Sequence, residues 1–130
     1  MRMKQVSVFV ENRPGRLMLV LGALAKADVN IRALSIADTA DFGIVRMILS
    51  DTEKGLEAVR AAGFAASTND VLRVEVPDRP GGLLTAIAEP LAAAGINLEY
   101  VYAFADRPLE NAMVVLKVGD IHAAEKLLKR

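Results

Sequence analysis

The chain has 130 residues, 53% of them hydrophobic, which is enough apolar material for one ordinary domain or two very small ones. Sixteen basic residues balance sixteen acidic ones, and no apolar stretch is long enough to cross a membrane, so we expect neither a nucleic-acid partner nor a membrane one and place the protein in the cytoplasm. With no cysteine and one histidine, disulfides, thiolate chemistry and multi-histidine metal centres are excluded, and we expect no metal and no cofactor.

The first half of the chain predicts the order strand, helix, strand, strand, helix, strand. Alternation from Lys4 to Glu11 predicts a strand with valines on one face. The segment Arg13-Pro14-Gly15 ends it, and we expect Pro14 at the first position of a helix that ends near Asp28. The remaining predicted elements are a strand at Ile31–Ala37, a turn at 38–43, a strand at Ile44–Ser50, a helix capped by Asp51 or Thr52 and ended by Gly63, and a strand at Phe64–Thr68.

The second half repeats this order. NRPGRL at 12–17 matches DRPGGL at 78–83, and VNI at 29–31 matches INL at 96–98. The predicted elements are a strand at Val71–Val76, a helix at Gly81–Ala94 ended by Gly95, strands at Asn97–Ala105 and Ala112–Val118, and a helix at Ile121–Leu128. We therefore expect an α+β fold of two tandem ferredoxin-like (βαββαβ) units, residues 1–69 and 70–130, each an antiparallel sheet with its helices on one face. The linker has two or three residues around Asn69, or is absent.

Two departures from the repeat carry structural predictions. The helix at Gly81–Ala94 holds one extra residue and Pro90 in its middle, which predicts a π-bulge or kink. The chain ends at Arg130, so the second unit lacks a last strand of its own. We expect a partner chain or the Phe64–Val76 segment to cover the resulting bare sheet edge, and hence at least a dimer.

The glycines that open the first helix of each unit suggest a site for a small ligand. Gly15 and Gly81 leave main-chain N–H groups uncovered at a helix N-terminus, which attracts a carboxylate. In the amides of Asn12 and Asn30, the oxygen could accept a hydrogen bond from the ammonium group of a zwitterion, and the NH₂ could donate one to its carboxylate. Structural alternatives stand beside each residue: Asn12 and Asp78 could cap their helices, Asn30 and Asn97 could satisfy the backbone at a corner, Arg16 could be a solvated helix-end cation rather than a carboxylate ligand, and Gly82 could be a flexible helix start.

Three aromatic residues occupy one predicted strand. Tyr100, Tyr102 and Phe104 share their parity with Leu98, which favours packing on a sheet face or an interface over a base-stacking platform, because the chain has no basic stripe. The single histidine, His122, is expected on the surface.

A unit whose first turn reads Glu11-Asn12-Arg13-Pro14-Gly15, followed by Val29-Asn30-Ile31, resembles the ACT domain, and Asp78-Arg79-Pro80-Gly81 with Ile96-Asn97-Leu98 extends the resemblance to the second half. The resemblance implies a regulatory module that binds amino acids or similar small ligands where two modules meet, between the first strand–helix loop of one and the second strand of the other. The site residues that it implies are Asn12, Arg13, Pro14, Gly15, Arg16, Leu17, Asn30 and Ile31 in the first unit and Asp78, Gly81, Gly82, Leu83, Asn97 and Leu98 in the second.

Two differences from the family pattern refine this expectation. Serine-binding members carry a histidine where this chain has Val10 and Val76, so a serine site of that kind is not predicted. Asp78 replaces the loop asparagine and would repel a carboxylate, so we expect binding first at the site of Asn12–Gly15 and Asn30.

The expected function is a non-enzymatic sensor that acts on a partner in trans, such as a biosynthetic enzyme, and forms a homodimer or a larger assembly. The alternatives are a dimerisation module without a ligand and, less favoured, a small enzyme on a ferredoxin-like scaffold.

Overall fold

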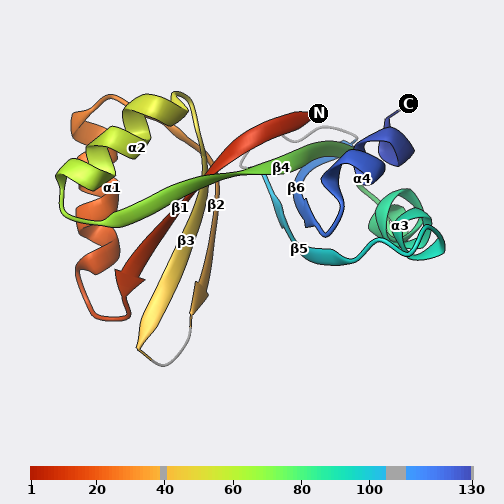
Figure 1. The fold of residues 1–130 in the computed structure, drawn as a ribbon, viewed down its shortest axis with the longest axis horizontal. Helices are drawn as coiled ribbons and strands as arrows, with labels where there is room; N and C mark the ends of the chain where they lie inside the picture. Colours follow the sequence, from red (N-terminus) through yellow and green to blue (C-terminus); the bar gives the residue numbers. More distant parts are fainter. Residues whose placement is uncertain (39–40, 105–110, 130) are drawn as a thin grey trace. The chain divides into compact units, whose positions relative to one another are not determined.

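The computed structural model describes residues 1–38, 41–104 and 111–129, so parts of the predicted turn at 38–43 and Ala105, the predicted end of a strand, lie outside the described residues. Figure 1 shows the elements in their chain order. They are β1 (Arg2–Glu11), α1 (Arg16–Lys26), β2 (Ile31–Asp38), β3 (Phe42–Leu49), α2 (Thr52–Ala61), β4 (Ala65–Pro77), the π-helix η1 (Leu84–Ala88), α3 (Glu89–Ala93), β5 (Leu98–Ala103), β6 (Asn111–Val118) and α4 (Ile121–Leu128).

The chain divides into two compact units, and each is described by itself. The N-terminal unit comprises Lys4–Asn69, and the C-terminal unit comprises Met1–Met3 together with Asp70–Arg130.

The N-terminal unit is an antiparallel sheet with strand order β2-β3-β1-β4 and helices on one face (Figure 1). Alternation buries Val6, Val8 and Val10 on the helix side of β1, where they join Val20 and Leu24 of α1 in one apolar core. This confirms the ferredoxin-like arrangement, because the period-2 pattern of the strand and the helical spacing of the leucines bury the same side.

The C-terminal unit has the same construction. Its strands follow the order β4-β6-β5, with both pairs antiparallel, and Leu72 of β4 lies opposite Leu116 of β6. Ile87 of η1, Leu91 of α3 and Ala124 of α4 complete its core. Helices of this unit also cover one face of the sheet, as predicted.

The start of β1 takes part of the place of the last strand that the second repeat lacks. Strand β4 runs without a linker through both repeats, and β1 is its neighbour in the sheet. In the C-terminal unit, the Arg73 N–H donates to the Met1 carbonyl at 2.7 Å, and Arg2 pairs with Glu125 at 3.2 Å. Residues 1–3, which the sequence analysis did not consider, therefore extend β1 alongside β4 as far as Arg73. A partner chain on the rest of this edge stays a prediction.

The long helix of the second repeat contains the predicted π-bulge. Residues Leu84–Ala88 form η1, and Pro90 follows in the first turn of α3. The wider turn absorbs the extra residue and the missing proline N–H together, which explains why the two occur side by side. The other proline prediction is wrong: α1 begins at Arg16 after Gly15, so Pro14 lies in the preceding turn.

Matching irregularities occur in the second strand of each unit. The pairing of β2 with β3 shifts between Ile31 and Ala33, and that of β5 with β6 shifts between Leu98 and Tyr100. Because a bulge inserts one residue, Leu98 packs on the helix-side core while Tyr100 and its stacked neighbour Tyr102 lie on the other face. The predicted common parity of Leu98 with the aromatic residues is therefore wrong.

Candidate ligand-binding site

The loop between β1 and α1 holds uncommitted polar groups. Gly15 has a φ of +87° and precedes α1, whose first hydrogen bond runs from the Leu19 N–H to the Gly15 carbonyl at 3.2 Å. The N–H groups of Leu17 and Met18 have no acceptor among the described residues. No side chain caps the helix, and the exposed carboxamide of Asn12 has no partner in the described part of the chain. The structural alternative for Asn12, a helix cap, is therefore not observed.

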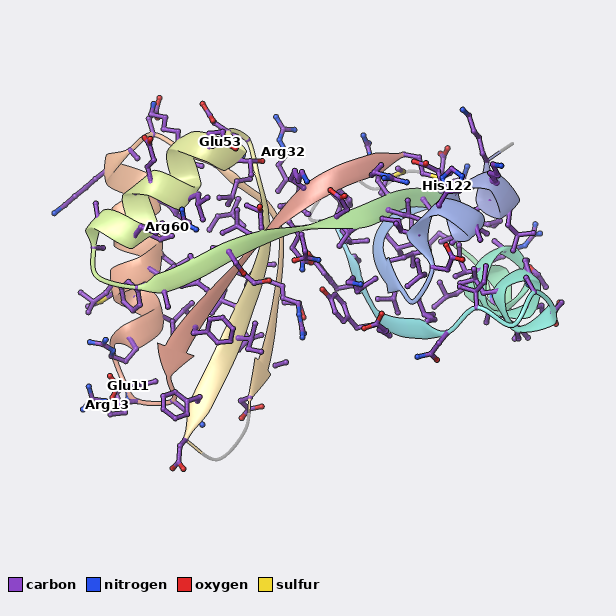
Figure 2. All side chains as sticks on the ribbon, viewed as in Figure 1. Glu11, Arg13, Arg32, Glu53, Arg60 and His122 are labelled. Atoms are coloured by element: carbon purple, nitrogen blue, oxygen red, sulfur yellow. The ribbon has the colours of Figure 1, made fainter. Side chains whose placement is uncertain are left out.

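Two arginines of this loop form ion pairs with the same carboxylate. Glu11 pairs with Arg13 at 3.0 Å and with Arg16 at 3.6 Å, and Figure 2 shows Glu11 and Arg13 together at the end of β1. Arg16 is not a solvated helix-end cation: its guanidinium lies 5.2 Å from the centre of the buried Phe64 ring. Its Nε is buried and has no hydrogen-bond partner among the described residues. The side chains of Glu11, Arg13 and Arg16 thus sum to one net positive charge. Asp41, whose carbonyl accepts from the Asn12 N–H at 3.0 Å, adds a carboxylate next to this loop.

The sequence does not indicate the role of Phe64. The strand pattern predicts Phe64 as the first residue of a strand, and no local pattern shows which loop residue its ring contacts. The contact with Arg16 depends on β4 lying beside β1, and only the sheet order brings them together.

The matching loop of the C-terminal unit differs in charge and in space. Pro77 stands where the first unit has Glu11, and the exposed Asp78 and Arg79 follow it. Gly82 is buried against Pro77, so it is a packing residue rather than a flexible helix start. Gly81 has a φ of +79°, like its counterpart Gly15.

The second strands begin with exposed asparagines. Ser50 makes two hydrogen bonds to the main chain of Asn30, both at 2.9 Å. The Asn30 N–H donates to the Ser50 Oγ, and the Ser50 N–H donates to the Asn30 carbonyl. The Asn97 carbonyl accepts from the Gly119 N–H at 3.0 Å. Neither asparagine side chain satisfies a backbone group in the described residues, so the corner-bridging alternative is not observed.

The loop and the second-strand asparagine of one unit lie far apart. Glu11 pairs with Phe42 at one end of β3, whereas Ile31 pairs with Leu49 at the other end. Seven residue steps along β3 separate these two positions, which is about 23 Å at ~3.3 Å per residue. A site made from the Asn12 loop and Asn30 therefore requires two ACT-like units rather than one. The remaining apolar candidates are partly buried or exposed. Leu17 and Leu83 lie where the first helical segment of each unit begins, and Ile31 and Leu98 are the first residues of β2 and β5.

No cluster of three or more potential metal ligands occurs in residues 1–38, 41–104 and 111–129. His122 is exposed on α4, as expected (Figure 2). Among the described helices, none has the length and apolar character that a membrane crossing requires.

The sequence matches the family model of the ACT domain pair over residues 1–127. The chain belongs to the family of paired ACT domains. No curated protein matches it.

Solved structures extend the comparison. The chain is 40% identical to protein BT0572 from Bacteroides thetaiotaomicron, with a TM-score of 0.91 over 99% of this chain and 88% of that one. It is 18% identical to the regulatory subunit of aspartate kinase from Thermus flavus, with a TM-score of 0.69 over 99% of this chain and 92% of that one. The second similarity shows the shared fold of the ACT pair and no more.

Proposed function

We propose that this ACT pair is a regulatory protein that binds an amino acid or a similar small ligand between the Asn12–Gly15 loop of one ACT unit and the Asn30 strand end of another. The observation that carries the proposal is that Asn12 has no structural task among the described residues. Uncommitted N–H groups and the guanidinium groups of Arg13 and Arg16 belong to the same loop, which suits the carboxylate of a zwitterion.

A second copy of the chain can supply the other ACT unit. Strands β1 and β2 run parallel, since both are antiparallel to β3, so the Asn12 loop lies near the end of β2 and Asn30 lies at its start. Two β2 strands paired antiparallel about a twofold axis would bring Asn30 of one copy to the Asn12 loop of the other.

The edge of the N-terminal unit suits such pairing. Strand β2 ends the strand order, and the apolar side chains Leu34 and Ile36 are 40% and 48% exposed on it. Leu21 of α1 is 36% exposed as well. Covering these side chains and pairing the β2 edge would favour a homodimer. Light scattering at micromolar concentration tests the dimer, and Ile36→Lys should yield a monomer.

The regulatory output would pass to a partner enzyme in trans in the cytoplasm. Regulatory subunits of aspartate kinase have this fold, which agrees with a role in regulation but names no partner for this chain. Ligand binding would act by favouring one arrangement of the two copies.

A thermal-shift screen of the twenty amino acids tests the ligand. A ligand at 100 times its Kd stabilises the fold by about 2.7 kcal/mol, or roughly 10 °C in Tm for a domain of this size. Asn12→Ala should keep the Tm of the free protein and lose most of the shift, whereas Asp78→Ala should keep both. If no amino acid shifts the wild type at millimolar concentration, a dimerisation module without a ligand takes the place of this proposal.

A further inference from the structure

The C-terminal unit contains a hollow of its own that is distinct from the loop of Asn12. It measures about 690 Å³ and lies where the corner before β5 meets the start of α4. Its volume is that of a small-molecule site, and it is open to solvent rather than enclosed. The residues that matter for its chemistry are Ile96, Asn97, Gly119, Asp120, Lys126 and Leu127.

A main-chain donor in this hollow lacks the acceptor that its counterpart has. In the N-terminal unit, the Ser50 hydroxyl accepts from the Asn30 N–H at 2.9 Å. Gly119 takes the place of Ser50, as its N–H bond to the Asn97 carbonyl at 3.0 Å shows. Without the hydroxyl, the Asn97 N–H has no acceptor among the described residues. One hydrogen-bond donor is thus available to an oxygen of a ligand.

The charges of the hollow also differ from those of the first repeat. Asp51 and Asp120 cap α2 and α4 in the same way, each accepting from the N–H three residues later at 3.1 Å. Counted from these caps, Lys126 stands where the first unit has Glu57. Lys126 forms no ion pair within residues 1–38, 41–104 and 111–129. The exchange of an acidic for a basic residue places a cation on the lining of the same hollow as the free N–H.

The remaining lining supplies an anion and an apolar wall. One oxygen of Asp120 accepts from the Ala123 N–H, and the other has no hydrogen bond to a described residue. Ile96 is half-buried, and Leu127 is 43% exposed at the rim. The hollow therefore combines donors for a carboxylate, an acceptor for an ammonium group and a surface for a hydrocarbon side chain.

We infer that this hollow is a second ligand site, contained within one ACT unit, for an α-amino acid with an apolar side chain. The ligand carboxylate binds the Asn97 N–H and the Lys126 ammonium. The ligand ammonium binds the Asp120 carboxylate, and the hydrocarbon side chain packs on Ile96 and Leu127. This site does not depend on the site between ACT units.

The test is a titration of the ¹⁵N-labelled full chain with L-leucine up to 10 mM, followed by two-dimensional amide spectra. We expect the largest shifts at the amides of Asn97, Gly119 and Lys126. Leucinamide, which has no carboxylate, should produce none of them. Lys126→Glu should weaken binding at least tenfold, while Lys129→Glu, which changes the same charge outside the hollow, should not.

Two serine and glycine exchanges make the test specific to the free N–H. Gly119→Ser restores the hydroxyl of the first repeat and should compete with the ligand for the Asn97 N–H, lowering the affinity at least tenfold. The site has room for it, since a Cβ atom on Gly119 meets no atom closer than 3.9 Å. The reciprocal Ser50→Gly should leave leucine binding in the hollow unchanged.

Three outcomes would overturn the inference: no shift at Asn97 with 10 mM leucine, equal losses in Lys126→Glu and Lys129→Glu, or undiminished binding in Gly119→Ser. Asn12→Ala separates the two proposals. Loss of the Asn97 response in that variant would assign the binding to the site between ACT units, whereas its retention together with a loss of ligand binding at the loop would leave the hollow as an independent site.

Discussion

Gly82 lies so close to the Pro77 carbonyl that a Cβ atom on residue 82 would overlap its oxygen. In the first repeat, the corresponding residues are Arg16 and Glu11, which carry large side chains and pair with each other. The two loops therefore share a motif but are packed differently, and Gly82 is required by backbone contact rather than by flexibility.

Gly82→Ala should destabilise the fold by about 1–3 kcal/mol, because a backbone carbonyl cannot move aside as a flexible side chain can. Gly22→Ala is the matched control. Gly22 lies inside α1 with no atom near its Cβ position, so alanine should stabilise the fold by roughly 0.5–1 kcal/mol. Urea unfolding measures both changes in the free energy of unfolding. If the two variants change it in the same direction, backbone contact is not what requires Gly82.

Gly15 is constrained by its backbone conformation alone. Its φ is +87°, and a Cβ atom would meet nothing within 4 Å. Gly15→Ala should therefore cost about 1 kcal/mol, and Gly15→Asn less, since asparagine adopts the left-handed conformation more readily. Thermal unfolding without ligand measures the difference, and an equal cost for both would contradict this reason. For the same reason, Asn12→Ala tests ligand binding more cleanly than valine at Gly15, whose strain would lower the Tm by itself.

The start of β1 should protect β4 in the C-terminal unit. Deleting Arg2 and Met3 withdraws the strand, so the Arg73 amide, which donates to Met1, should lose at least tenfold of its protection from hydrogen exchange. Arg2→Ala removes only the partly exposed ion pair with Glu125 and should cost less than about 1 kcal/mol. Unchanged exchange at Arg73 in the deletion variant would show that β1 is not needed there.

Pro90 should have little effect on the free energy of unfolding, although it lies within a helical segment. A proline inside a regular α-helix costs about 3 kcal/mol, but here it follows the π-turn of η1 and lies in the first turn of α3. Pro90→Ala should therefore change the free energy of unfolding by less than about 1 kcal/mol. A stabilisation of 2–3 kcal/mol would show that the π-turn does not accommodate the proline.

Local features of the sequence were sufficient to predict most elements. Alternating valines in β1, the cap at Asp51 and the stop at Gly63 depend on neighbours within a few residues, so the repeat and its ferredoxin-like order could be predicted. The π-bulge at Pro90 belongs to the same class, since an inserted residue and a proline act on their own helical turn.

The sequence by itself thus determined the two ACT units and their strand and helix order, whereas the structure decided that Asn12 does not cap its helix. Only the tertiary structure decided that residues 1–3 lie beside the start of β4 in the second unit, that the Arg16 guanidinium stacks over Phe64, and that the Asn12 loop and Asn30 lie at opposite ends of β3. Each of these depends on which strands are neighbours in the sheet, and strand pairing joins residues far apart in the chain that no local pattern relates.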